Sequence, residues 1–309
     1  MSRRVAGYIT SLVVLLASAS CVGSRCPIKK RYLMISSGAT RHQTREEAAE
    51  PIITVWIHGT FNNPVFKKFH TCPNIGLWKA SDLPETYHLK TIAQILARED
   101  ARQFDLDSFY AFGWSGALSF QARELAARDL YRELQREHYA YTTKHGQAPK
   151  IRLITHSHGG NVALNLAKVR LPNNKLVIDE LIMLGTPIQN ETACYVNDPF
   201  FKTIYSLYSH ADMLQIMDPQ GIYHEQRKKK TKPFFSKRTF QLNPYTFQTA
   251  IKYNGRAIAH TEFLLSHFIT ILPQILQELR SWHAQEKENP AFNKTDVEYV
   301  LKIKTKKKA

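Results

Sequence analysis

The chain has 309 residues, of which 43% are hydrophobic and 22% are charged. This composition supports a folded core and is not that of a chain disordered throughout. The formal net charge of +16 indicates attraction to anionic surfaces. Neither zinc-finger spacing nor an RNP-type aromatic motif accompanies the charge, so the sequence argues against a nucleic-acid partner.

The first twenty residues have the pattern of an export signal. Arg3 and Arg4 precede an apolar stretch at 5–17 that is too short to span a bilayer comfortably. Two processing sites compete after it: Ala17-Ser18-Ala19 fits a peptidase site, and 18–21 resembles a bacterial lipobox ending at Cys21. We expect a signal peptide at 1–20 and an exported protein, secreted or anchored as a membrane lipoprotein, with a polar linker at 21–50.

Apolar runs and helical periodicities alternate over the next part of the chain. Runs at 52–57, 109–112, 151–154, 181–184 and 203–208 predict buried strands. Helical spacing of apolar residues predicts helices at 85–98, 118–138, 162–169 and 262–280. Pro273 should kink the last helix or split it in two. The alternation predicts an α/β fold, with a doubly wound, mostly parallel sheet and helices on both faces.

These boundaries predict one domain at 51–282, followed by a basic tail at 283–309. A basic and aromatic insertion near 219–248 interrupts the domain, and whether it forms a lid stays open. Residues 296–304 alternate loosely and are compatible with an extra edge strand. In an oxidising compartment Cys72 and Cys194 are the first pair to test for a disulfide. No CxxC or His/Cys cluster has metal-ligand spacing, and we expect no metal and no cofactor.

The central motif is Thr155-His156-Ser157-His158-Gly159-Gly160, between an apolar strand and an Ala/Leu-rich helix. That context is typical of a nucleophile elbow, in which the residues two before and two after the serine must be small. Gly159 meets this requirement, and Thr155 is larger than the usual glycine. The following helix directs its N-terminus at Ser157, which favours developing negative charge. The alternative is a serine that only caps the helix.

Together with His58-Gly59-Thr60, this motif resembles the lipase/esterase branch of the α/β-hydrolase superfamily over roughly residues 50–282. The elbow motif is most similar to that of GPI-inositol deacylase-like proteins and related bacterial lipases. Thr155 departs from their pattern, in which glycine is usual at this position. The resemblance implies the α/β-hydrolase fold and the chain order serine, acid, histidine. A rival serine, Ser115 in 113–117, lies one strand too early for the nucleophile.

The resemblance also assigns the remaining site residues. The acid is Asp212, a few residues after the fifth strand, with Asp218 as runner-up because it begins an ordinary turn. The base is His260, just before the final helix, in preference to His267 inside that helix and to His210 near the acid. The expected oxyanion donors are the backbone N–H groups of Thr60 and His158. Three aromatic side chains are expected to line the substrate pocket: His58, Trp114 and His156.

The sequence therefore predicts a serine hydrolase that cleaves a carboxylic ester through an acyl-Ser157 intermediate, with a lipid ester as a candidate substrate. A membrane surface is a candidate partner because of the predicted export and the basic charge. Three alternatives stay open: a non-catalytic surface lipoprotein with the same fold, a peptidase, thioesterase or acyltransferase on the same triad, and, least supported, nucleic-acid binding. The sequence leaves the acyl chain, the head group and the oligomeric state open.

Overall fold

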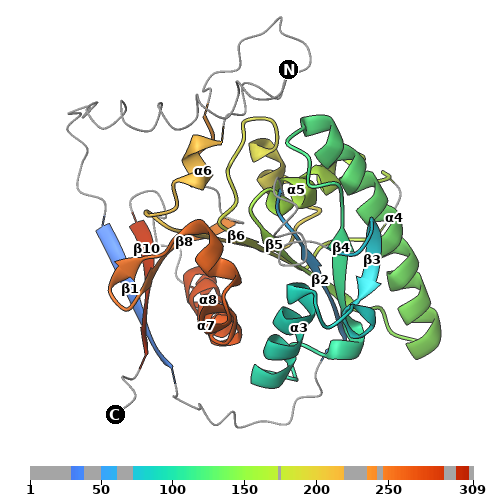
Figure 1. The fold of residues 1–309 in the computed structure, drawn as a ribbon, viewed down its shortest axis with the longest axis horizontal. Coiled ribbons are helices and arrows are strands. Elements are labelled where there is room, and N and C mark those ends of the chain that lie inside the picture. Colours follow the sequence, from blue (N-terminus) through green and yellow to red (C-terminus); the bar gives the residue numbers. More distant parts are fainter. Residues whose placement is uncertain are drawn as a thin grey trace, which may run out of the picture.

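The computed structural model describes residues 29–37, 50–60, 72–172, 175–218, 235–241, 246–288 and 297–305. Its strands are β1 (Lys29–Ser37), β2 (Ile52–Ile57), β3 (Gly76–Lys79), β4 (Phe109–Gly113), β5 (Lys150–His156), β6 (Glu180–Leu184), β7 (Ile204–Tyr208), β8 (Thr246–Tyr253), β9 (Arg256–Ala257) and β10 (Val297–Thr305). They form one ten-stranded sheet in the order β1-β10-β8-β7-β6-β5-β2-β4-β3, with β9 beside β8 (Figure 1). Every pairing is parallel except β3 with β4 and β9 with β8.

Helices cover both faces of this sheet. They are α3 (His88–Glu99), α4 (Phe120–His145), α5 (Gly159–Val169), α6 (Leu214–Met217), α7 (Ser266–Ile269) and α8 (Leu272–Glu288). Apolar side chains of α3, α7 and α8 belong to one buried cluster, and those of α4 and α5 belong to another. The structure thus confirms the predicted doubly wound, mostly parallel α/β sheet with a helical layer on each side.

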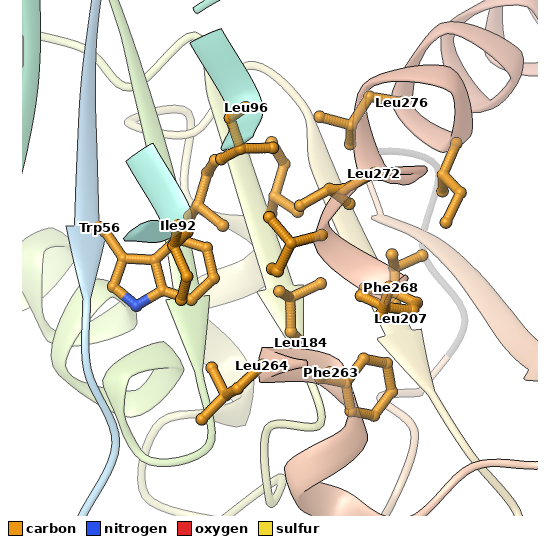
Figure 2. Packing of buried hydrophobic residues seen from close by; sticks show 14 of the residues in the cluster. Trp56, Ile92, Leu96, Leu184, Leu207, Phe263, Leu264, Phe268, Leu272 and Leu276 are labelled. Carbon is orange, nitrogen blue, oxygen red and sulfur yellow. The ribbon is translucent and has the colours of Figure 1, made fainter. Parts of the chain in front are cut away.

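One of the two cores fixes the position of the segment that begins at His260. This segment is a short 3₁₀ helix, η6 (His260–Leu264). Its Phe263 and Leu264 point into the cluster formed with Trp56, Leu184 and Leu207 of the sheet and with the helices above it (Figure 2). Both side chains are buried. Burying two large apolar side chains contributes roughly 3–6 kcal/mol toward holding η6 in place.

The predicted strands are confirmed as β2, β4, β5, β6 and β7, each within two residues of the expected bounds. The helix predicted at 118–138 is longer than expected and ends at Gly146, which adopts a left-handed φ of 70°. Pro273 divides the last predicted helix into α7 and α8. It is the second residue of α8, where a missing N–H leaves no intrahelical bond unmade.

Three predictions about loops and tails are wrong in part. Residues 29–37 of the expected linker form β1, and residues 297–305 of the expected tail form β10, which lies inside the sheet rather than at its edge. The insertion predicted near 219–248 ends earlier, because β8 begins at Thr246. Residues 76–79, for which the sequence predicts no element, form β3. These strands are short or alternate apolar with basic residues, so their composition is that of a loop.

Cys72 and Cys194 do not pair. Cys72 is buried and Cys194 is exposed, so this first pair to test for a disulfide is not joined in the structure. The predicted signal peptide at 1–20, Cys21 and most of the basic insertion lie outside the described residues. Among the helices that the structure describes, none combines the length and the apolar character that a membrane crossing requires.

Candidate active site

Ser157 occupies a sharp turn between the central strand β5 and helix α5. Its φ is 54°, in the left-handed region that residues with a Cβ rarely adopt. Among the described residues other than glycine, only Asn254 shares a positive φ, and asparagine tolerates that conformation better than serine. The Ser157 amide donates to the Leu184 carbonyl at 2.9 Å, so the strand pairing of β5 with β6 runs up to the turn. A serine strained in this way at a strand-to-helix turn is the geometry of a nucleophile elbow.

Two glycines allow this turn to sit against the end of β2. A Cβ on Gly59 would lie 2.7 Å from the Cβ of Ser157 and 3.0 Å from the His156 carbonyl oxygen. A Cβ on Gly159 would lie 2.4 Å from the Ile57 carbonyl oxygen. Only glycine fits at either position without a shift of backbone. The loop after β2 is therefore packed directly on Ser157.

Thr155, the departure from the usual elbow, is accommodated. Its side chain is buried, and its hydroxyl donates to the Ile182 carbonyl at 3.3 Å. The larger residue therefore extends along β6, away from the turn that Gly159 keeps clear. A hydrogen-bonded threonine at this position costs little, because its polar atom keeps a partner after burial.

Asp212 and His260 are far apart in the sequence, and the structure brings their side chains together. Nδ1 of His260 lies 2.7 Å from Oδ2 of Asp212. Because a carboxylate only accepts, the proton of the imidazole is on Nδ1, and Nε2 is left as an acceptor. The other carboxylate oxygen, Oδ1, accepts the backbone N–H of Gln215 at 3.2 Å. Asp212 is fully buried, and both of its oxygens are hydrogen-bonded.

The loop that carries Asp212 is held by residues that sequence patterns did not single out. The guanidinium of Arg238 donates to the carbonyls of Ser209, His210 and Asp212 at 3.0–3.2 Å. Gln215 donates to the Thr186 carbonyl at 2.9 Å. Arg238 belongs to the basic insertion predicted near 219–248. A run of basic residues does not indicate which of them folds back onto the domain.

His156 links the elbow to His260. Its ring packs on the His260 ring with centroids 4.6 Å apart, and its Nε2 donates to the His260 carbonyl at 3.1 Å. His156 immediately precedes Ser157, so the contact places the His260 ring beside the turn. On the other side of η6, His88 of α3 donates to the Leu264 carbonyl at 2.8 Å. His260 is thus fixed at its ring, at its backbone and at the end of its helix.

His58 and Trp114, predicted to line the pocket, contact each other instead of standing free. Their rings stack 5.7 Å apart, and Trp114 donates its indole N–H to the His58 carbonyl at 2.8 Å. His58 Nδ1 donates to the Gly59 carbonyl at 2.7 Å, and its Nε2 accepts the Trp114 amide at 3.2 Å. Both side chains are almost fully buried. The pair braces the loop that packs on Ser157, and a role in binding substrate stays a prediction.

The rival residues lie elsewhere. Ser115 is exposed, and α4 begins only at Phe120, so Ser115 does not form a strand-to-helix elbow. His267 lies in α7, 4.0 Å from Glu262, and His210 contacts Glu298 at 2.7 Å. Asp218 contacts His158 rather than His260. Among the described residues, no three His, Cys, Asp or Glu side chains are grouped to hold a metal ion.

The two expected oxyanion donors belong to the loop after β2 and to the start of α5, which meet beside Ser157. Thr60 comes just after Gly59, and His158 just after Ser157, so both segments adjoin the serine. The Thr60 hydroxyl is buried and has no hydrogen-bond partner among the residues that the structure describes. His158, at the N-terminus of α5, has helical backbone angles. The positive end of the helix dipole therefore lies next to Ser157, which favours an anion there.

The chain matches no protein-family model and no curated protein sequence. One similar solved structure is described as a hormone-sensitive lipase from a metagenome library. It is 15% identical, with a TM-score of 0.33, over 82% of this chain and 67% of that one. Sequence identity and structural similarity this low do not indicate the activity of this chain. The assignment to the α/β-hydrolase type of fold rests on the sheet, its two helical layers and the elbow after β5.

Proposed function

We propose that the protein is a serine hydrolase that cleaves carboxylic esters, with Ser157 as nucleophile, His260 as general base and Asp212 as the acid that orients it. The observation that carries the proposal is the hydrogen bond of His260 Nδ1 to the buried Asp212, beside a serine held at a positive φ. A serine with a purely structural role has no need of that strain.

The reaction begins when Ser157 Oγ attacks the ester carbonyl and its proton passes to His260 Nε2. Asp212 accepts the Nδ1–H bond throughout and stabilises the imidazolium without taking its proton. The backbone N–H groups of Thr60 and His158 receive the oxyanion, and losing one such donor costs about 2.7–4 kcal/mol of transition-state stabilisation. His260 then protonates the leaving alcohol, and water attacks the acyl-Ser157 with His260 again as base.

A lipid-like ester suits the surroundings of the acid and the base. Met213 and Leu214 follow Asp212 directly and are 51% and 59% exposed, and Leu265 follows η6 and is 37% exposed. Large apolar side chains exposed on the loops that carry both catalytic groups favour an apolar substrate. With the net charge of +16 and the predicted export signal, they support action at an anionic lipid surface.

The test is hydrolysis of p-nitrophenyl esters of graded chain length, from acetate to palmitate. Wild-type protein should hydrolyse them, and Ser157→Ala should lower kcat by roughly 10⁶-fold, to background. Ser115→Ala is the matched control, because Ser115 is an exposed serine in the rival motif, and it should retain activity. Turnover that survives in Ser157→Ala, or that disappears in Ser115→Ala, would contradict the assignment. A wild type inactive on the whole series would favour the non-catalytic alternative.

A further inference from the structure

A second histidine–aspartate contact involves the residue that immediately follows Ser157. Nε2 of His158 lies 3.2 Å from Oδ1 of Asp218, and both side chains are buried. The proton transfers of the proposed reaction use neither side chain. Because a buried hydrogen bond to a carboxylate is shielded from water, it is stronger than the same contact at the surface.

Asp218 is itself fixed in place. Its Oδ2 accepts the side-chain N–H of Gln189 at 2.7 Å and the hydroxyl of Ser236 at 2.6 Å. The Ser236 amide donates to the Asp218 carbonyl at 3.1 Å. Asp218 therefore joins three segments distant in sequence: the elbow, the loop after β6 and the segment that leads into β8. A turn aspartate with no such role would point into solvent.

The partners of His158 determine which of its ring nitrogens carries the proton. Asn161 Nδ2 donates to the Pro187 carbonyl at 2.9 Å, and its Oδ1 accepts the Thr192 hydroxyl at 2.5 Å, which fixes the orientation of the amide. The same Nδ2 lies 3.4 Å from His158 Nδ1, which must therefore accept. Nε2 then carries the proton and donates it to Asp218. Burial also lowers the pKa of His158, in keeping with a neutral ring.

A neutral imidazole with both nitrogens engaged in this way is not available as a second general base. The contacts with Asp218 and Asn161 instead fix the side chain of His158, and hence the peptide group between Ser157 and His158. That peptide follows a residue at a positive φ of 54° and precedes the first turn of α5. Its N–H is the oxyanion donor of the proposed reaction, which must point at the developing charge before the reaction begins.

We propose that Asp218 is a positioning residue that acts through the His158 imidazole to aim the His158 backbone N–H at the oxyanion. The inference rests on the proposed ester hydrolysis. Asp218→Asn keeps the size of the side chain but replaces an acceptor oxygen with a donor, which repels the Gln189, Ser236 or His158 donor facing it. We expect kcat to fall about 10- to 100-fold, with KM within about 3-fold of the wild-type value. A misdirected donor stabilises the transition state less and leaves substrate binding unchanged.

A transition-state analogue separates this role from a general loss of structure. An alkyl trifluoromethyl ketone forms an oxyanion when Ser157 adds to it, whereas a non-hydrolysable ether analogue of the substrate forms none. In Asp218→Asn the ketone should bind more weakly by the same factor as kcat/KM, and the ether should bind as in wild type. Equal affinity for the ketone in both proteins, or parallel losses for ketone and ether, would overturn the inference.

Two further variants guard against misfolding. Asp179→Asn is the matched control, because Asp179 accepts from the Ile151 amide at 2.9 Å and from Lys202 at 2.7 Å at the opposite end of β5, and it should keep wild-type kcat. If Asp218→Asn does not fold, Ser236→Ala removes one donor to Asp218 and should lower kcat and ketone affinity together by a smaller factor. Unchanged values in Ser236→Ala would then overturn the inference. A wild type without esterase activity overturns the proposed function as well, whereas an active wild type with a fully active Asp218→Asn overturns this inference alone.

Discussion

The protonation states of the histidines around Ser157 follow from what each ring nitrogen contacts. His260 donates from Nδ1 to Asp212, His156 donates from Nε2 to a carbonyl, and His58 accepts at Nε2 from the Trp114 amide. A base must present an unprotonated nitrogen to the serine and keep its other nitrogen anchored. The contact with Asp212 gives His260 that state, while His156 and His58 are engaged in holding backbone.

Asp212→Asn tests this assignment of protons. The new amide can donate to Nδ1, which would move the ring proton to Nε2 and leave no acceptor for the serine. We expect kcat to fall by about 10⁴-fold, with KM little changed. Steady-state hydrolysis of p-nitrophenyl butyrate measures the effect, and circular dichroism checks the fold. A variant within tenfold of wild-type kcat would show that another group orients the base.

Gly59→Ala tests the close packing of the β2 loop on the elbow. The added methyl would lie 2.7 Å from the Ser157 Cβ, so the loop must move away and carry the Thr60 amide with it. We expect at least roughly a 10²-fold loss of kcat, as for a lost oxyanion donor. Gly146→Ala is the control: its φ is 70° and a Cβ there meets nothing within 4 Å. It should cost about 1–2 kcal/mol of stability and leave kcat unchanged. Equal activity in both variants would contradict the packing argument.

At this scale the sequence predicts Ser157 from the strand, turn and helix signals around it, and the resemblance to α/β-hydrolases implies Asp212 and His260 from the chain order serine, acid, histidine. Their catalytic roles stay predictions until activity is measured. It does not predict that Arg238 holds the acid loop or that Asp218 holds His158. Those contacts join segments far apart in the chain. Their geometry depends on how the loops run, and no local sequence pattern predicts that. Ser236 and Gln189 give no signal for the same reason.

Among the elements, the strands buried on both faces are the easiest to predict, because β2 and β6 are nearly continuous apolar runs. The strands at the other end of the sheet were missed or misplaced. In β1 and β10 buried residues such as Ile35 and Ile303 alternate with exposed ones such as Met34 and Lys304. Such strands are half-covered, so their basic residues suggest a linker or a tail.

A partly buried ionic cluster joins three elements on the amino side of the sheet. Glu180 of β6 accepts from Arg152 of β5 at 2.7 Å and from Arg280 of α8 at 2.5 and 2.8 Å. Both arginines also donate to Gln103. Burial alone would raise the pKa of Glu180, but the hydrogen bonds and charges of the two arginines outweigh it and lower the pKa to about 2.

This cluster predicts a loss of stability in acid. A carboxylate whose pKa is lower in the folded state stabilises the fold above its unfolded pKa of 4.5, and that contribution is lost as the pH falls toward 2. Its size is on the order of 3 kcal/mol. Urea denaturation should show Glu180→Gln less stable than wild type at neutral pH, with the difference shrinking between about pH 4.5 and 2. Glu85→Gln is the control, because the Glu85 side chain is 75% exposed. A difference that stays constant with pH would contradict the account.

In the whole molecule, the two ends of the described chain meet in the sheet. β1 pairs with β10 over their full length, and β10 pairs with β8, so the described part extends the domain predicted at 51–282 in both directions. Leu301 and Ile303 of β10 belong to the same buried cluster as the η6 residues that hold His260. The C-terminal strand is therefore part of the core that supports the site.

Leu301→Ala tests whether this strand is structural. The side chain is fully buried, so its truncation should cost about 2–5 kcal/mol of unfolding free energy. Lys304→Ala, on an exposed position of the same strand, should change it by less than about 0.5 kcal/mol. Chemical denaturation of both variants gives the comparison. Equal stabilities would mean that residues 297–305 behave as the solvated tail that their composition suggests.

The sheet also explains why the site forms where it does. Ser157 follows β5 and Asp212 follows β7, and parallel strands deliver their carboxyl ends to one edge, where η6 brings His260. The most direct test of the central claim is the mass spectrum of the protein after reaction with a fluorophosphonate. The account predicts one adduct per chain, mapped to Ser157 and lost in Ser157→Ala. An adduct at another residue, or an adduct that persists in Ser157→Ala, would contradict it.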